Sequence, residues 1–286
     1  MTIAVTAASG SLGPLVIDEL LARGVRPSQL VAVVRDLGRA EQMAAQGVTV
    51  RQGNYDNPPS LVAALEGVSR VLVISGTERG RRVVQHANAI DAARAAGVGL
   101  IAYTSVLRAG EATLNPLLEE HVGTERYLEA SGVPFVMLRN GFYTENYVPQ
   151  ARRVLASGEL LTSAGEGRTA SASRRDFAAA AAAVLTTPGH EGQRYELAGG
   201  TGWTMHDLAE VIGRIGARQV HVRQVDAPSH LEALLGAGMA QPMAELTVAI
   251  DQAVRAGELD TKGGDLERLA GRATTPLEDG LRAAMA

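Results

Sequence analysis

The stretch Val5-Thr-Ala-Ala-Ser-Gly-Ser-Leu-Gly13 joins a short apolar run, Ile3–Thr6, to the first segment with helical periodicity. Gly10 and Gly13 are three residues apart, and Ala7 precedes Gly10 by three. Glycines in a first strand-to-helix turn let backbone N–H groups and a helix N-terminus approach a pyrophosphate. A plain tight turn is the alternative. The prediction of a dinucleotide site therefore depends on the pattern in the rest of the chain.

Short apolar runs alternate with amphipathic segments through the first half of the chain. Continuous apolar runs are typical of parallel strands buried on both faces, and several of the amphipathic segments end at a glycine in the C-cap position. The expected strands are Ile3–Thr6, Leu30–Arg35, Val48–Arg51, Val71–Ser75, Leu100–Thr104 and Phe135–Arg139, and the expected helices lie near 12–23, 37–46, 60–66, 80–96 and 117–131. This alternation predicts an α/β fold with a doubly wound parallel sheet, the Rossmann arrangement.

The rhythm changes after about residue 140. We expect a Rossmann domain at 1–140, joined by a further strand and helix from 170–200, and a smaller, mostly helical C-terminal lobe at 141–286. The elements expected after residue 140 are an alanine-rich helix at Arg175–Thr187, a strand at Arg194–Leu197, a helix opening at Thr204 and a strand at Gln219–Val225. In doubly wound proteins the ligand crevice lies at the carboxyl ends of the strands, so the lobe would cover it. The alanine-rich helix can pack internally or against a second subunit, which leaves a homodimer open.

Composition excludes several classes of function. The chain has 286 residues, 46% of them hydrophobic and 20% charged, with a net charge of −4 and no cysteine. No block of basic residues suits nucleic acid, and no apolar run is long enough for a membrane helix. The start of the chain lacks the basic region of a secretory signal, so we expect a cytoplasmic protein. No two histidines have the helical i, i+4 spacing of a metal site, and no metal is predicted.

The end of the second expected strand indicates which dinucleotide binds. NAD-binding units place an acid about 20 residues past the glycines, where it holds the ribose 2′-hydroxyl. Arg35 occupies that place here, followed by Asp36. An arginine can pair with the 2′-phosphate of NADP, and Arg39, one helical turn further, can assist. The sequence thus favours NADPH over NADH, with an ordinary surface charge at Arg35 as the alternative.

Several segments resemble one known family. Thr6-Ala-Ala-Ser-Gly-Ser-Leu-Gly13, Ile101-Ala-Tyr-Thr-Ser105 and Leu138-Arg-Asn-Gly-Phe-Tyr-Thr-Glu-Asn146 are similar to segments of the NmrA-like atypical short-chain dehydrogenases/reductases. The branch that the chain most resembles is that of the bacterial NAD(P)H:quinone oxidoreductases and triphenylmethane reductase. The similarity extends over nearly the whole chain. It implies a Rossmann domain, a small C-terminal lobe and NADPH-dependent reduction of quinone-like acceptors.

The resemblance also assigns residues by motif position. It implies that two groups of residues contact the cofactor: Ser9, Gly10, Ser11, Leu12, Gly13 and Arg35 at the nucleotide, and Ser75, Gly76, Asn140, Gly141, Phe142 and Arg174 at the nicotinamide end. One cofactor position departs from the family, which usually has glycine where this chain has Ala7. If the turn needs a positive φ there, alanine adds strain of ~1–2 kcal/mol.

The chemistry is limited by the scarcity of lysine. Ordinary short-chain dehydrogenases use a tyrosine and a lysine four residues later for proton transfer, and Lys262, the only lysine here, is far from a suitable tyrosine. Hydride transfer from the cofactor to a small-molecule acceptor such as a quinone remains available. Because a quinone oxygen gains negative charge as hydride arrives, nearby donors help.

Three residues are candidates for that catalytic donor role: His121, Asn140 and Tyr143. For His121, an ordinary surface histidine on a helix is the alternative. Tyr103 and Ser105, at the end of the fifth expected strand, can line the pocket, with a packing role favoured for Tyr103.

A redox sensor that binds NADP(H) and reports it to a partner protein, with little turnover, is the alternative function. The missing Tyr–Lys pair suits a sensor as well as it suits a reductase. The family-like segment Asn140–Asn146 favours the reductase, since a sensor has less need of a furnished acceptor pocket.

Overall fold

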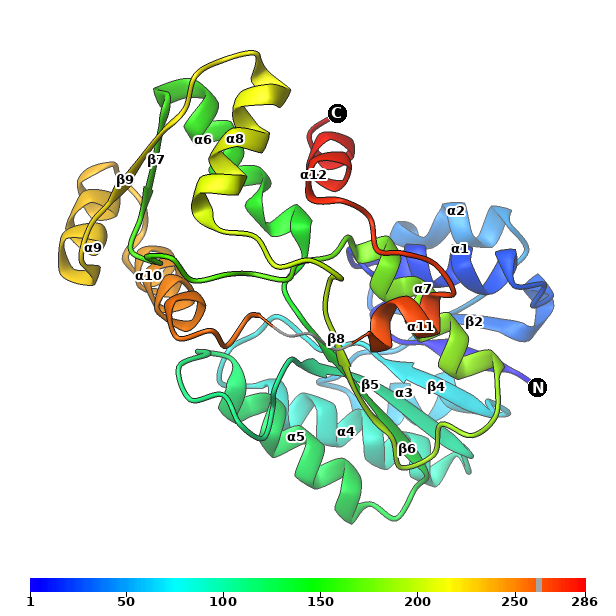
Figure 1. Ribbon diagram of the computed structural model, residues 1–286. Coiled ribbons are helices and arrows are strands. Elements are labelled where there is room, and N and C mark those ends of the chain that lie inside the picture. Colours follow the sequence, from blue (N-terminus) through cyan, green and yellow to red (C-terminus); the bar gives the residue numbers. More distant parts are fainter. Residues whose placement is uncertain (261–263) are drawn as a thin grey trace.

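The computed structural model describes residues 1–260 and 264–286. Its centre is a seven-stranded sheet in the order β3-β2-β1-β4-β5-β6-β8, in which every neighbouring pair is parallel (Figure 1). The strands are β1 (Ile3–Val5), β2 (Leu30–Val34), β3 (Thr49–Gln52), β4 (Arg70–Val73), β5 (Leu100–Val106), β6 (Phe135–Asn140) and β8 (Arg194–Leu197). The direction of the strand order reverses between β1 and β4. In a doubly wound sheet, this switch point opens a crevice at the carboxyl ends of the strands. The predicted fold is therefore confirmed.

Helices cover both faces of the sheet because the strands are apolar on both sides. Ile3 and Val5 of β1 pack into one buried cluster, and Ala4 between them packs into the other. The first cluster lies under α1 (Gly13–Ala22), η2 (Leu37–Ala40), α2 (Glu41–Ala45), α7 (Arg174–Thr186) and α11 (Asp265–Ala270), and the second under α3 (Pro58–Leu65), α4 (Arg82–Ala95) and α5 (Leu118–Ala130). A short helical turn, η1 (Pro27–Gln29), precedes β2.

The alanine-rich helix α7 is an internal packing element. A capping box between Ser173 and Asp176 starts it, and α1 and α11 pack against it. All six consecutive alanines, Ala178–Ala183, are buried within the chain. Small side chains let the neighbouring helices approach closely. This helix accordingly offers no exposed alanine face to a second subunit.

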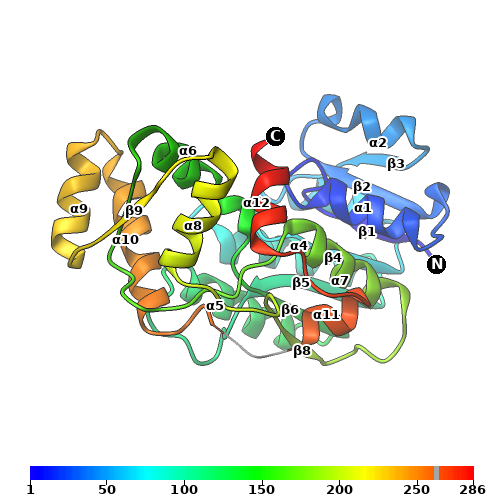
Figure 2. The same ribbon diagram turned by 45° about the horizontal axis from the view of Figure 1, so that its top comes forward.

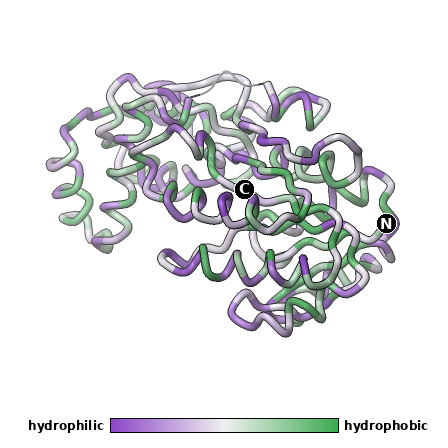
Figure 3. The backbone as a smooth tube through the Cα atoms, turned by 90° about the horizontal axis from the view of Figure 1, so that it is seen from below, coloured by the Kyte–Doolittle hydropathy of each residue, from purple (hydrophilic) through white to green (hydrophobic). Residues whose placement is uncertain are grey.

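The C-terminal part lies beside the carboxyl ends of the strands (Figures 1 and 2). Its elements are η3 (Thr144–Tyr147), α6 (Val148–Ser157), β7 (Glu159–Thr162), α8 (Met205–Gly216), β9 (His221–Gln224), α9 (Ala227–Gly236), α10 (Gln241–Arg255) and α12 (Leu277–Met285). Thr204 caps α8 through the predicted capping box with Asp207. β7 is absent from the sequence prediction and pairs with β9 in a second, two-stranded parallel sheet. Hydropathy alternates along the outer helices in Figure 3, as amphipathic helices require.

No helix among the described residues is long and apolar enough to span a membrane.

Candidate functional site

The loop after β1 forms a cradle of backbone groups at the start of α1. The residue before that helix, Leu12, provides no side-chain cap, and the first turn contains no acidic residue. The N–H groups of this turn are therefore left for an external acceptor, and the positive end of the helix dipole favours an anion there. A Cβ on Gly13 would lie 2.4 Å from the carbonyl oxygen of Ala8, so only glycine allows this close approach.

Ala7 has a φ of 48°, so this turn does need the left-handed conformation in which alanine is strained. An alanine in this region of φ/ψ space carries strain of about 1–2 kcal/mol. The turn keeps its hydrogen bonds, because Gly10 N–H donates to the carbonyl of Ala7 at 2.9 Å and Ala8 N–H donates to Val33 at 3.1 Å. The chain therefore retains the turn geometry that glycine would adopt without strain.

A cavity of about 700 Å³ runs along the carboxyl ends of the strands. Its lining includes all of the predicted cofactor residues except Gly13, which lies at the base of the cradle: Ala7, Ser9, Gly10, Ser11, Leu12, Arg35, Ser75, Gly76, Asn140, Gly141, Phe142 and Arg174. His121 and Tyr143 line it as well. The sheet order places Arg35, after β2, and His121, beyond β5, on opposite sides of the switch point.

At the β2 side, Arg35 is solvent-accessible, with 69% of its side chain exposed. It lies 3.9 Å from the carboxylate of Glu78, and Arg39 lines the same part of the cavity. Asp36, which follows Arg35, also lines the cavity, and its Oδ1 accepts the N–H of Gly38 at 3.0 Å and caps η2. One oxygen of the competing acid is therefore used within its own turn.

The loop after β4 is fixed from two sides. Ser75 N–H donates to Thr104 Oγ1 at 2.9 Å, and Gly76 N–H donates to Nε2 of His86 at 2.9 Å. The carbonyl of Gly76 accepts Nε–H of Arg82 at 2.7 Å. Both main-chain polar groups of Gly76 are therefore used within the protein, and the residue presents its Cα surface to the cavity.

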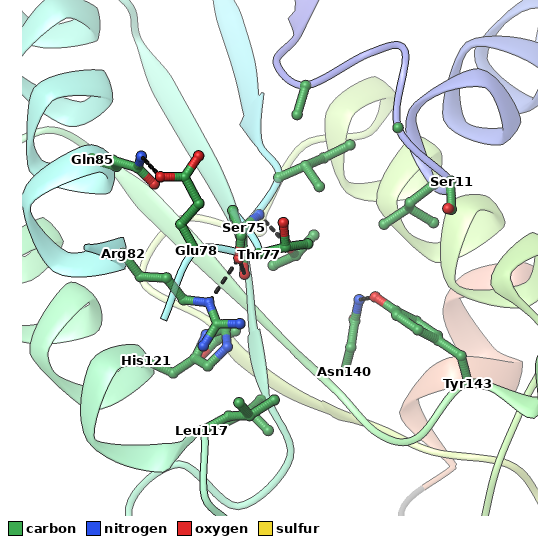
Figure 4. Close-up of a pocket in the computed structure, with 18 of the residues that line it drawn as sticks. Ser11, Ser75, Thr77, Glu78, Arg82, Gln85, Leu117, His121, Asn140 and Tyr143 are labelled. Atoms are coloured by element: carbon green, nitrogen blue, oxygen red, sulfur yellow. Dashed lines mark hydrogen bonds between the residues drawn. The ribbon is translucent and has the colours of Figure 1, made fainter. Parts of the chain in front are cut away.

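The segment after β6 forms the opposite wall, on the Ser11 side of the cavity (Figure 4). Nδ2 of Asn140 donates to the phenolic oxygen of Tyr143 at 3.0 Å, and the Arg174 guanidinium lies 5.1 Å from the centre of the Tyr143 ring. Burial raises the pKa of Tyr143, so the phenol keeps its proton. Oδ1 of Asn140 and Oγ of Ser105 are buried without a hydrogen-bond partner. Because buried polar atoms are rarely left unpaired, these two mark where a ligand would bind.

His121 is buried, with only 5% of its surface exposed, so the surface-histidine interpretation is wrong. Its Nδ1 lies 2.8 Å from the hydroxyl of Tyr103. Burial, and then the charges of His86 and Arg82, lower the pKa of His121 to about 3. The side chain is therefore a neutral imidazole at physiological pH.

Sequence reasoning missed the residues beside His121. Arg82 lies in the first turn of α4, and Figure 4 shows its guanidinium next to the His121 ring, with Leu117 beyond it. Gln85, one turn along α4 from Arg82, and Tyr55, shortly after β3, also line the cavity. Their position near the carboxyl ends of β3 and β4 is the signal that could have identified them.

The C-terminal lobe closes the cavity with apolar side chains: Ile250, Ala253 and Leu259. The carboxylate of Glu258 accepts the main-chain N–H groups of Thr113, Leu114 and Asn115 at 2.8 to 3.1 Å. It thereby ties the loop before α5 to the lobe. Among the described residues no cluster of histidine, aspartate and glutamate side chains could hold a metal ion. Lys262 lies outside the described residues.

A Rossmann sheet, an uncapped helix after a glycine-containing turn and unpaired polar atoms at the carboxyl ends of β5 and β6 together define a dinucleotide-binding protein. The residues present fit such a ligand. The chain belongs to the NAD(P)H-binding family, whose domain matches residues 7–188.

Similarity to known proteins extends over the full chain. The chain is 42% identical to quinone oxidoreductase 2 of Escherichia coli (strain K12), over 97% of this chain and 96% of that protein. The crystal structure of the E. coli NADPH-dependent quinone oxidoreductase with NADPH aligns with a TM-score of 0.95 at 41% identity, covering 100% of both chains. The NADP(H) complex of Citrobacter sp. triphenylmethane reductase aligns with a TM-score of 0.93 at 40% identity, covering 99% of this chain and 100% of that one. The predicted resemblance is confirmed.

Proposed function

We propose that this protein is an NADPH-dependent reductase that transfers hydride to quinone-like or related conjugated acceptors. The observation that carries the proposal is that the cavity lined by the predicted cofactor residues is also lined by apolar side chains that include Leu117 and Ile250. A site that only binds a dinucleotide has less need of this apolar wall, whereas a quinone-like acceptor would pack against it. The names of the relatives above, a quinone oxidoreductase and a triphenylmethane reductase, support the same reaction class.

The cradle at Ser9–Gly13 would hold the pyrophosphate through main-chain N–H groups and the positive end of α1. Arg35 and Arg39 would contact the 2′-phosphate, which is why we propose NADPH rather than NADH. Oδ1 of Asn140 and Oγ of Ser105 would receive polar groups at the nicotinamide end, since both are buried and unpaired. Arg174, held against Tyr143, would limit movement of this wall.

A reduced nicotinamide bound here supplies the hydride. The lobe residues Ile250, Ala253 and Leu259 exclude water from the apolar end of the cavity. His121 donates a hydrogen bond to the acceptor oxygen that gains negative charge, and the positive field of Arg82 favours that charge. The proton that completes the hydroquinone comes from solvent, because the neutral His121 holds none to spare at neutral pH.

The test is spectrophotometric measurement of NADPH oxidation with simple quinones, cationic dyes and enones. Turnover of at least one quinone at about 1 per second or faster, near the ordinary enzyme range, would support the proposal. Rates no higher than those without protein would overturn it. NADP(H) binding without turnover would favour the sensor, for which a partner protein must bind the two redox forms with different affinities.

A further inference from the structure

Two aromatic side chains from different elements, Tyr103 and His86, meet at the buried side of His121. The hydroxyl of Tyr103, on β5, lies 2.8 Å from Nδ1 of His121 on α5 and 3.3 Å from Nδ1 of His86 on α4. Tyr103 and His86 have no exposed surface. The rings of His86 and Tyr103 pack edge to face, with centres 5.3 Å apart. Such a group has little freedom to rotate, so its hydrogen bonds decide where each proton lies.

The proton of His86 is fixed by its neighbours. Burial and the charge of Arg82 lower the pKa of His86 to about 4, so the ring is neutral and carries one proton. Nε2 accepts the N–H of Gly76 and must be unprotonated, which places the proton on Nδ1. Nδ1 lies 3.0 Å from Oγ1 of Thr124, and that hydroxyl donates its own hydrogen to the carbonyl of Glu120 at 2.8 Å. Thr124 therefore accepts the proton of His86.

Two nitrogen atoms lie within hydrogen-bond distance of the phenolic oxygen of Tyr103 with suitable geometry, Nδ1 of His86 at 3.3 Å and Nδ1 of His121 at 2.8 Å. Nδ1 of His86 already carries a proton, so the acceptor is Nδ1 of His121. A neutral His121 must then carry its proton on Nε2. None of the described residues hydrogen-bonds that atom, and His121 lines the cavity. Every donor in the cluster then has an acceptor except Nε2–H, which is left for a ligand.

We propose that Tyr103 and His86 are positioning residues that fix His121 in the Nε2–H tautomer and so present a donor to the acceptor. The inference rests on the proposed function for the identity of the ligand, and on the hydrogen bonds and the burial of the two histidines for the tautomer. The cluster is not a proton wire. If His121 gave its Nε2 proton to the acceptor, Nδ1 of His121 would take the proton of Tyr103, and Tyr103 would take the Nδ1 proton of His86. His86 could then regain a proton only at Nε2, and that atom already accepts the amide N–H of Gly76. The cluster therefore holds a hydrogen bond and delivers no proton.

The experiment compares Tyr103→Phe with Tyr195→Phe. Tyr195 provides a matched control, since its hydroxyl also lies within hydrogen-bond distance of a histidine, at 2.7 Å from Nδ1 of His190. Tyr195 and His190 do not line the cavity. NMR of ¹⁵N-labelled histidine rings in cofactor-free and NADPH-loaded protein reports which nitrogen of His121 carries the proton. We expect Nε2–H in the wild type and in Tyr195→Phe, and a mixture of tautomers in Tyr103→Phe.

Turnover provides the second measurement. Tyr103→Phe should lower kcat with a quinone about tenfold, the effect of one hydrogen bond, and leave the Kd for NADPH unchanged. In a His121→Ala background the same substitution should lower kcat no further, because a positioning residue acts through the residue it positions. A purely structural tyrosine would lower kcat equally in both backgrounds.

Two results would overturn the proposal. One is a proton on Nδ1 of His121 in the wild type, which can be read without any variant and so does not depend on Tyr103→Phe folding. The other is an unchanged tautomer in Tyr103→Phe. Absence of wild-type turnover would instead reject the proposed function, and the NMR result would still decide the role of Tyr103 and His86.

Discussion

Nη1 of Arg82 lies 2.8 Å from the carboxylate of Glu120, and the two form a largely buried ion pair beside the acceptor end of the cavity. Glu120 also accepts the N–H of Gly80 at 2.7 Å, while Arg82 donates to Gly76. The pair thus links the start of α5 to the loop after β4. It also places a cation next to His121 and His86, where it helps to keep both rings neutral.

Removing one member of this pair leaves a buried charge without its partner. We expect Arg82→Met to lower the free energy of unfolding by about 3 kcal/mol. The double variant Arg82→Met/Glu120→Gln should lose less, because no unpaired charge remains. Arg94→Met, which removes an exposed pair with Asp91, should change stability by less than about 1 kcal/mol. Urea titrations of the wild type and the three variants measure these differences. A double variant that is less stable than Arg82→Met would contradict the argument.

The strained turn at Ala7 predicts a gain on substitution by glycine. Ala7→Gly relieves about 1–2 kcal/mol of strain, and the added freedom of the unfolded chain offsets about 0.4–1 kcal/mol. Stability should therefore rise slightly, and NADPH affinity should rise as well because Ala7 lines the cavity and its methyl group would no longer crowd the cofactor. Ala217, at the end of α8 with φ of 47°, is the control: Ala217→Gly should raise stability and leave affinity unchanged. If calorimetry gives equal NADPH affinities for Ala7→Gly and the wild type, the methyl group is already accommodated in the bound state.

The preference for NADPH should depend on Arg35. We expect Arg35→Ala to weaken NADPH binding by about 1.5–3 kcal/mol, the size of a charge-assisted contact, with little effect on NADH. Titration of both cofactors against the variant and the wild type tests this, with Arg26→Ala as a control because Arg26 does not line the cavity. A preference that survives the substitution would make Arg35 an ordinary surface charge, the alternative that its 69% exposure leaves open.

The central sheet could be predicted from the sequence because the pattern that specifies each strand lies within that strand and its neighbouring turns. Continuous apolar runs and the glycines after the helices suffice to locate six of the seven central strands and their alternation with helices, and the seventh, β8, coincides with the strand predicted at Arg194–Leu197. Ala7 is a further example, since its left-handed φ follows from the turn type. The predicted helix at 37–46 is divided into η2 and α2 at Ala40, whose backbone (φ −121°, ψ 13°) departs from helical geometry.

The polar contacts at the site could not be predicted in the same way. Burial of His121 depends on Tyr103 and His86, which are 18 and 35 positions earlier in the chain and belong to other elements. Nothing local distinguishes Arg82 from the other arginines, because its pair with Glu120 forms only where α4 packs on α5. Strand β7 is short and forms only because β9, far along the chain, pairs with it. Such features arise from long-range contacts that periodicity does not encode.

The lowered pKa values predict how activity responds to acid. If His121 acts as a neutral donor, kcat for a quinone should stay flat as pH falls from 8 to about 5, because the pKa of His121 lies near 3. A histidine acting as general acid near its ordinary pKa of about 6.5 would instead raise kcat as pH falls through that value. His121→Ala should lower kcat ~10–1,000-fold across the whole range and leave cofactor affinity unchanged.

The same shifts affect stability. The folded protein keeps His86 and His121 unprotonated, while the unfolded chain takes up protons below about pH 6.5. Stability is therefore lost as pH falls from about 6.5 toward 4, by about 1.4 kcal/mol per pH unit for each histidine. Denaturation curves at successive pH values should show His121→Asn losing less stability over this interval than the wild type. An identical pH dependence would mean that the histidine is not held neutral in the folded state.

Two leucines on one loop separate a reductase from a cofactor sensor. Leu117 lines the cavity beside His121, whereas Leu114, three residues earlier, is 49% exposed and lies outside the lining. Leu117→Gln should lower kcat/KM for a quinone about 10–100-fold, since a polar amide is then buried against the acceptor. Leu114→Gln should have no effect, and both variants should bind NADPH as the wild type does. Phe142 is less suited to this test because its ring packs on Tyr147, 5.1 Å away, in the core of the lobe. If both variants keep wild-type turnover, the apolar end of the cavity is not the acceptor site. If the wild type itself shows no turnover, the apolar end must serve a partner or a conformational response to the cofactor.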